Sequence, residues 1–254
     1  MSSAKLVLLP KPIIYPETDG EPIAENTKQY NAITTIKGNV EIQFAGDPLV
    51  LVAADLFWYP KEGDPTVRTA PDTLVVFGVP KGDRGSYKQW EENNLPPQVV
   101  FEVLSPGNRL GEMTRKFAFY NEWGVEEYYI FDPEDGSWDG WIRRDGQLRP
   151  VPVMAGWISP RLGIRFELGQ DQELWLFRAD GQRFLTMLQL ETRRCEAEER
   201  SELDLRAREQ AQQRADLQQQ RADQQQQRAE LAERRIAQLT AKLQEAGIDL
   251  STES

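Results

Sequence analysis

The chain has 254 residues, of which 39% are hydrophobic and 28% charged, enough for one large domain or two small ones. It contains no histidine and a single cysteine, Cys195, which excludes histidine-based catalytic triads, zinc sites built on imidazole and an intramolecular disulfide framework. The net charge of −11 argues against a general nucleic-acid coat, because phosphate contacts need basic residues, but an enzyme can still meet DNA through a local basic edge.

The first part of the chain predicts an arm, a helix and several strands. Residues 1–16 carry a short apolar patch broken by prolines, which indicates an extended arm and not a signal peptide. No apolar run approaches the roughly 20 residues of a membrane helix, so we expect a cytoplasmic protein without membrane contact. Apolar residues recur at helical spacing from Ile23 to Phe44 and predict a helix. Short apolar runs then predict strands at residues 49–53, 56–59 and 74–79.

The most informative stretch covers residues 97–133. It opens with an apolar strand pattern at 99–104, continues with a helical pattern that Gly124 ends as a C-cap, and closes with a second apolar strand at 128–131. Strand, helix and strand in so few residues predict a βαβ unit with parallel strands. We therefore expect an α/β protein.

Beyond Pro133 the pattern changes twice. Short apolar segments first alternate with Asp-Gly turns and predict hairpins that complete and cover the sheet. From about Leu188 the chain is rich in Arg, Glu, Gln and Ala, and residues 191–246 contain no proline, glycine or aromatic residue. Arg-Ala-Asp or Arg-Ala-Glu triplets recur every seven residues, which is typical of a heptad repeat. The positions of this repeat that would face a partner helix form a seam, and they are apolar only near the C-terminal end. We therefore expect a long charged helix that pairs weakly through residues 229–246, or else a solvated single helix.

Two carboxylates stand out against the apolar strands. Glu102 lies inside a buried strand pattern, where a carboxylate is costly unless a metal ion, a cation or hydrogen bonds pair with it. Asp72 starts another apolar strand. If the two strands are neighbours, the carboxylates converge, and one is then protonated or a cation lies between them. Oxygen ligands of this kind suit Mg²⁺ or Mn²⁺.

Lys116 lies in the helix that follows the Glu102 strand. From there its amine can point back over the strand ends, where it would position a water or stabilise charge that develops on a phosphoryl group. Each of these residues also has a plainer interpretation. Asp72 can be a turn or cap residue, Glu102 a structural carboxylate paired with Lys116, and Lys116 a surface lysine that pairs with Glu112 on its own helix.

These residues carry a family resemblance. Over about residues 15–185 the chain resembles the putative restriction endonuclease family of the Uma-two type, which belongs to the PD-(D/E)XK nuclease superfamily. The C-terminal helix also resembles an extension seen in one subgroup of that family. The motif residues, in order, are Pro71-Asp72, Phe101-Glu102-Val-Leu-Ser-Pro, Lys116, Tyr120, Gly124-Val125, Glu127-Tyr128 and Asp132-Pro133.

The resemblance implies a mixed sheet flanked by helices and a metal-dependent DNA endonuclease. Asp72 and Glu102 would be the metal ligands for Mg²⁺ or Mn²⁺, and Asp72, Glu102 and Lys116 the catalytic residues. The superfamily lysine normally follows the glutamate by two residues, where this chain has Leu104, and a helix lysine such as Lys116 takes that role in this family.

The resulting domain prediction has three parts. Residues 1–187 would form a restriction-endonuclease-like domain, residues 188–247 a charged helical or coiled-coil extension, and residues 248–254 a disordered tail. The expected partners are DNA and further copies of the same chain, as in a dimer. Two alternatives stay open: an inactive member of the fold that acts as a binding module, and a scaffold that self-associates through its C-terminal helix.

Overall fold

The computed structural model describes residues 13–18, 20, 22–105, 107, 110–169 and 174–245. It divides the chain into two compact units, Met1–Leu190 and Glu191–Ser254, which are considered separately below. Residues 13–16 of the expected arm carry no regular secondary structure. The rest of that arm and the expected tail at 248–254 lie outside the described residues.

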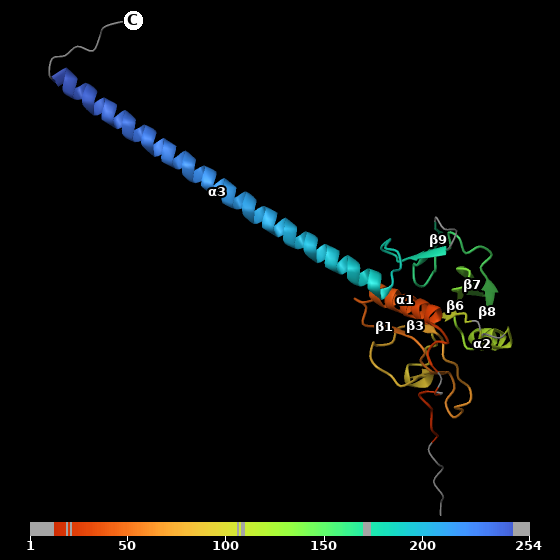
Figure 1. Ribbon diagram of the computed structural model, residues 1–254. Helices are drawn as coiled ribbons and strands as arrows, with labels where there is room; N and C mark the ends of the chain where they lie inside the picture. Colours follow the sequence, from red (N-terminus) through yellow and green to blue (C-terminus); the bar gives the residue numbers. More distant parts are fainter. Residues whose placement is uncertain are drawn as a thin grey trace, which may run out of the picture. The chain divides into compact units, whose positions relative to one another are not determined.

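A six-stranded mixed sheet forms the centre of the first unit (Figure 1). Strands β5 and β6 are parallel neighbours, as the βαβ pattern predicted, and the other neighbouring pairs in the sheet are antiparallel. In spatial order the strands are β1 (Val50–Ala53), β3 (Thr73–Phe77), β5 (Val99–Val103), β6 (Glu127–Asp132), β7 (Ser137–Arg144) and β8 (Gln147–Pro150).

Helix α1 (Thr27–Gln43) packs on one face of this sheet. Asn26 caps it by accepting a hydrogen bond from the backbone N–H of Gln29. The core on this face joins residues of α1 to alternate residues of the strands. The helix contributes Ile33, Ile36 and Val40, and the strands contribute Val75, Val99, Phe101, Val103 and Tyr129. The helix continues through Gly38, because its apolar face is buried there against the sheet.

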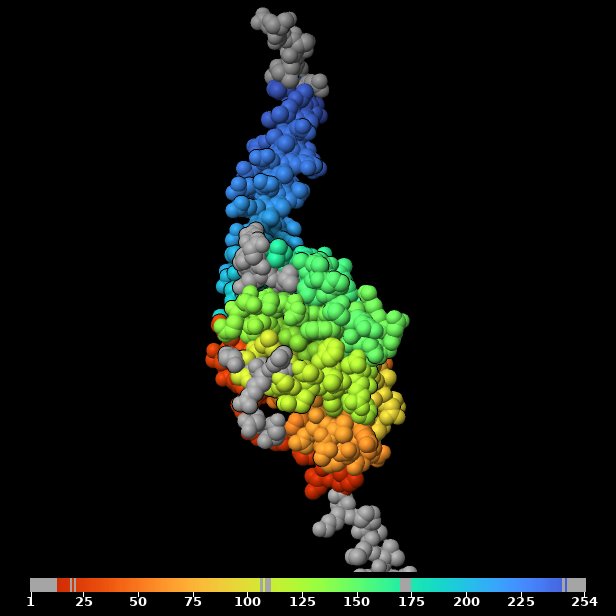
Figure 2. Space-filling view, turned by 90° about the vertical axis from the view of Figure 1, so that its right-hand side faces the viewer, coloured from red at the N-terminus to blue at the C-terminus, as the bar shows by residue number. Residues whose placement is uncertain are grey.

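Helix α2 (Leu110–Glu122) belongs to the core on the opposite face. Side chains of a strand alternate between its two faces, so the intervening strand residues point here. This core gathers Trp58, Leu74, Val76, Val100, Tyr120 and Tyr128. In Figure 2 the orange surface of the chain's first third borders the yellow-green surface of the α2 region, which agrees with the shared core.

Two small sheets complete the unit. Strands β2 (Trp58–Tyr59) and β4 (Tyr87–Lys88) pair in parallel, while β9 (Arg165–Leu168) and β10 (Leu174–Phe177) form an antiparallel ribbon. The predicted Asp-Gly hairpin turn between β7 and β8 is present, with positive φ at Asp145 (51°) and Gly146 (79°).

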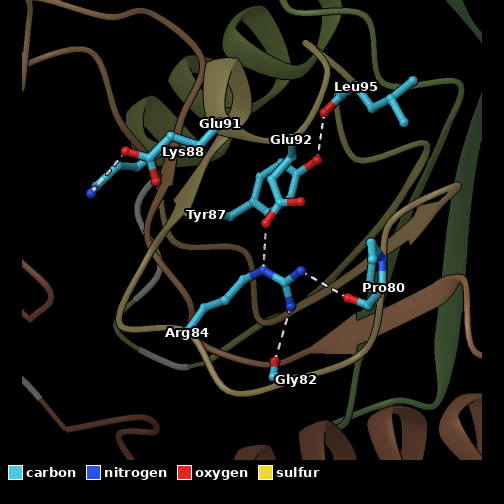
Figure 3. A network of polar contacts seen from close by, with 8 residues as sticks. All are labelled: Pro80, Gly82, Arg84, Tyr87, Lys88, Glu91, Glu92 and Leu95. Carbon is cyan, nitrogen blue, oxygen red and sulfur yellow. Dashed lines mark hydrogen bonds and ion pairs between the residues drawn. The ribbon is translucent and has the colours of Figure 1, made fainter.

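The polar segment before β5 is held in place by its own contacts (Figure 3). Arg84 donates to Glu92 at 2.7 Å and to the carbonyl oxygens of Pro80 and Gly82. Tyr87 is fully buried and its hydroxyl donates to the carbonyl of Leu95 at 2.6 Å. A short 3-10 helix, η1 (Gln89–Glu91), follows β4. The segment is therefore fixed against the α2-side core, to which Tyr87 belongs.

Helix α3 (Met187–Glu245) is 59 residues long, and its residues from 191 to 239 are exposed. Among the described residues, no helix has the length and apolar character needed to cross a bilayer. The predicted α/β class, a mixed sheet with flanking helices and a long C-terminal helix, is confirmed.

Candidate functional site

The register of the sheet sets Asp72 opposite Glu102. In the antiparallel pair of β3 and β5, Thr73 faces Phe101 and Leu74 faces Val100, so one further step brings Asp72 across from Glu102. Both carboxyls share the α2-side face with Leu74 and Val100, because strand residues alternate. The Glu102 side chain is 1% exposed and Asp72 is partly buried. The two predicted acids therefore lie side by side.

Asp72 is fixed by the backbone beside Glu102. Its Oδ2 accepts a hydrogen bond from the backbone N–H of Val103 at 2.6 Å. Burial and the neighbouring Glu102 carboxylate raise the pKa of Asp72 well above its usual range. The Lys116 amine and the Val103 N–H act in the opposite direction, but burial and repulsion prevail. The neutral form of the Asp72 carboxyl is therefore favoured in this buried, acidic place.

Lys116 reaches this pair from α2. Its Nζ lies 2.7 Å from Glu102 Oε2, and its side chain is 18% exposed. Burial alone would lower the pKa of Lys116, but the carboxylates of Glu102 and Asp72 more than offset it and raise the pKa to about 12. The amine is therefore charged at neutral pH. Glu112 also contributes to this shift, yet the hydrogen bond of Lys116 is to Glu102.

The other oxygen of Glu102 has a donor of its own. Tyr120 lies one helical turn after Lys116, so both side chains leave the same face of α2. The Tyr120 hydroxyl donates a short hydrogen bond to Glu102 Oε1. Its ring is fully buried and stacks on Trp58 with the ring planes 3° apart. Burial and the Glu102 carboxylate raise the pKa of this hydroxyl well above its usual range.

The arrangement suits a divalent cation with few protein ligands. In the described part of the chain, no group of three or more His, Cys, Asp or Glu side chains is placed so that it could hold a metal ion. Mg²⁺ commonly takes one or two carboxylates and fills its remaining positions with water. Among the described residues, the buried hydroxyl of Tyr128 has no hydrogen-bond partner. Burial, followed by the carboxylates of Glu102 and Asp72, raises its pKa. A water molecule held by a cation at Asp72 and Glu102 would give such a buried hydroxyl a partner.

Comparison with known proteins supplies the family. The sequence model described as "Uma2: Putative restriction endonuclease" matches residues 14–205. The chain belongs to the Uma2 family. Among solved structures, it is similar to a putative nuclease belonging to DUF820 from Anabaena variabilis, with 13% sequence identity and a TM-score of 0.40. That similarity covers 53% of this chain and 72% of the other. No curated protein matches this chain.

Two residues of this Uma2 member support the site although we did not predict them there. Tyr120 was only a motif residue, and its helical spacing from Lys116 was the available signal. Gln29, which is 7% exposed, donates from Nε2 to the carbonyl of Val103 at 3.0 Å and so ties α1 to the end of β5. The sequence placed Gln29 only within the predicted helix from Ile23 to Phe44, and that local pattern carries no signal of a contact with β5.

Glu25 secures the loop that follows β5. Its Oε2 accepts from Ser105 Oγ at 2.8 Å and from the backbone N–H of Gly107 at 3.1 Å. A Cβ on Gly107 would lie 2.3 Å from this carboxylate, so a larger residue there would displace the end of the Glu25 side chain. Glu25 thus shapes the connection between Glu102 and the helix that carries Lys116.

A second buried carboxylate lies on the opposite face of the sheet. Glu127 is 1% exposed and accepts from Tyr129 Oη at 2.8 Å, Ser159 Oγ at 2.5 Å and the backbone N–H of Arg161 at 2.6 Å. Burial raises the pKa of Glu127, while these three donors oppose the shift. The carboxylate is fully hydrogen-bonded and ties β6 to the segment around Ser159, which is a structural role.

Proposed function

We propose that this Uma2 member is a metal-dependent DNA endonuclease that hydrolyses phosphodiester bonds. Asp72 and Glu102 would hold Mg²⁺ or Mn²⁺, and Asp72, Glu102 and Lys116 would be the catalytic residues. The family supports a nuclease, and restriction-endonuclease-like proteins generally use divalent metals. The observation that carries the proposal is the convergence of two carboxyls and one amine on one face of the sheet.

The residues divide the chemistry among them. A cation at this position would polarise a phosphoryl oxygen and activate a water molecule. Asp72 is held by the Val103 N–H, and Glu102 by Tyr120, so both carboxylates are oriented before a cation arrives. Lys116 keeps its positive charge because of the two acids. With a cation held by the two acids, the Lys116 amine would position the water or stabilise charge on the phosphoryl group.

The main test compares Asp72→Ala with the wild type in plasmid cleavage with Mg²⁺ or Mn²⁺. We expect loss of cleavage in Asp72→Ala, and calorimetric titration should show loss of Mn²⁺ binding. Asp139→Ala, which removes an exposed acid of β7, is the matched control and should keep both properties. Identical cleavage by wild type and Asp72→Ala would refute the proposal.

A second candidate is an inactive binding or scaffold protein of the same fold. It is favoured by the complete pairing of Glu102, whose two oxygens are occupied by Lys116 and Tyr120. A structural ion pair would look the same. In that case Mn²⁺ binding without cleavage, or neither, is expected from the purified wild type.

The wider setting is also a proposal. We propose that residues 1–187 act as the nuclease-like domain and residues 188–247 as a helical extension. DNA is the proposed substrate, met through a local basic edge because the net charge is −11. We propose a cytoplasmic protein that self-associates as a homo-oligomer.

A further inference from the structure

Within its described range, helix α3 carries a line of arginines that form no ion pair with a carboxylate. Arg214, Arg221, Arg228 and Arg235 recur every seven residues, so they share one face of the helix at steps of about 10 Å. All are exposed. The residues one turn before and after each of them are Ala, Leu or Gln. Elsewhere on α3, Arg194 and Arg206 have carboxylate partners, but in the described range of α3 none of these four does.

A second line of side chains has the same spacing. The Nε2 groups of Gln212, Gln219 and Gln226 donate to Asp216, Asp223 and Glu230, at 2.8, 2.8 and 3.2 Å respectively. Each glutamine points its amide hydrogens at a carboxylate of its own helix, which leaves the amide oxygen as an acceptor. Glu233 continues the line one heptad further.

The heptad repeat places these two lines on either side of one seam. One seam position holds Ala215, Ala222, Ala229, Ile236 and Leu243, and the other holds Gln218, Gln225, Ala232 and Leu239. The arginines then occupy one flank of the seam, and the glutamines with Glu233 occupy the other. In two-stranded coiled coils the flanks of one helix meet those of its partner and set the orientation. A free donor on one flank and a free acceptor on the other are complementary.

We propose that α3 pairs with α3 of a second copy of the chain, parallel and in register. Arg214 would face Gln219 of the partner subunit, Arg221 would face Gln226 of the partner subunit, and Arg228 would face Glu233 of the partner subunit. The inference deepens the proposed self-association by naming its orientation and contacts. It does not depend on the chemistry of Asp72 and Glu102.

The charges decide the orientation. An antiparallel pair would bring the two arginine lines together, where like charges repel. The alternative partner for these arginines is the phosphate backbone of a nucleic acid. The net charge of −11 opposes it, and so do the carboxylates of Asp216, Asp223 and Glu230 on the same stretch of helix.

Disulfide trapping tests the orientation. In the full chain with Cys195→Ser, Ala215→Cys and Ala229→Cys are made in separate variants and oxidised. A parallel pair in register gives a covalent dimer for both variants, because each seam position meets its own copy. Gln227→Cys, on the outer face, is the control and should remain monomeric on a denaturing gel. Linkage only in a mixture of the two seam variants would mean an antiparallel pair and would overturn the proposal.

A charge exchange tests the contacts. Arg228→Glu should raise the dimer dissociation constant about tenfold by replacing attraction with repulsion in both symmetry-related contacts. Glu233→Arg should do the same, and the double variant should return to within about twofold of the wild type. Arg234→Glu is the control, because Arg234 directly follows Glu233 but lies on the outer face of the helix. It should leave the dissociation constant unchanged. Sedimentation equilibrium gives the constants, and circular dichroism confirms that each variant stays helical.

Two results would reject the pairing. One is a wild-type mass of a single chain by light scattering at every concentration. The other is a loss of duplex DNA affinity in Arg221→Glu and Arg228→Glu with no change in mass. Because plasmid cleavage depends on Asp72 in a separate assay, a monomer that still cuts DNA would reject the pairing and leave the nuclease proposal intact.

Discussion

At the scale of single residues, Glu102 is the decisive side chain. A buried carboxylate is costly unless its oxygens have partners, and here Oε2 has the amine of Lys116 and Oε1 the hydroxyl of Tyr120. Asp72 adds a second acid on the neighbouring strand, where burial and the nearby Glu102 raise its pKa well above the usual range. The proposed cation would therefore take the place of a proton on Asp72.

Two neighbouring tyrosines give a matched test of the Glu102 partners. Tyr120→Phe removes a donor to a charged, buried oxygen and should lower the free energy of unfolding by about 1.5–3 kcal/mol. Tyr128→Phe removes a buried hydroxyl that has no partner, so it should change that free energy by less than about 0.5 kcal/mol or stabilise the protein. Urea denaturation measures both. Equal losses would mean that the Tyr120 contact contributes nothing specific.

Lys116→Met tests the ion pair. Removing the amine leaves a buried carboxylate without its cation, which should destabilise the fold by about 2–4 kcal/mol near pH 7. Folding raises the pKa of Lys116 from 10.5 to about 12. The stability that the pair contributes is therefore fully present at pH values below the pKa of the unfolded chain, and it is lost as the pH rises through the pKa of the folded protein.

The difference in unfolding free energy between wild type and Lys116→Met should therefore be flat from about pH 7 to pH 9. Urea titrations at several pH values measure it. A difference that falls steadily across this window would show that the amine is not held by the two acids.

At the scale of elements, β6 is anchored by Glu127 on the face opposite the candidate site. Glu127→Ala removes three hydrogen bonds and leaves the donors of Tyr129, Ser159 and Arg161 without an acceptor. We expect a loss of about 3 kcal/mol or more in the free energy of unfolding. Because β6 is the parallel neighbour of β5, this loss would also loosen the strand that carries Glu102.

Glu126→Ala is the natural control for that change. Glu126 is the preceding residue, and its side chain, 37% exposed, pairs with Arg161 at the surface. Exposed ion pairs contribute little, so the expected loss is below about 1 kcal/mol. Thermal melts of the two variants side by side would distinguish an anchor in the core from a surface pair, and equal melting temperatures would contradict the assignment.

At the scale of the whole molecule, the globular part should not need the long helix. Residues Met1–Leu190 form one compact unit with both hydrophobic cores. Truncation after Leu190 should therefore keep a cooperative unfolding transition within a few degrees of the full chain. Differential scanning calorimetry measures this. A truncated chain without a cooperative transition would show that the helix is part of the folding unit.

The sequence by itself determined the class and order of the elements. Apolar alternation at 99–104, the helical spacing up to Gly124 and the second run at 128–131 predicted a parallel βαβ unit, and β5, α2 and β6 confirm it. These patterns are local, because each reflects which face of a single element is buried.

Only the tertiary structure decided what meets Glu102. The register of β3 on β5 brings Asp72 across from it, and the packing of α2 on that face directs Lys116 and Tyr120 to its two oxygens. Such contacts depend on strand register and helix placement, which residues far apart in the sequence settle together. The partners of a buried carboxylate are therefore set by the fold, whereas the need for partners is already evident from the sequence.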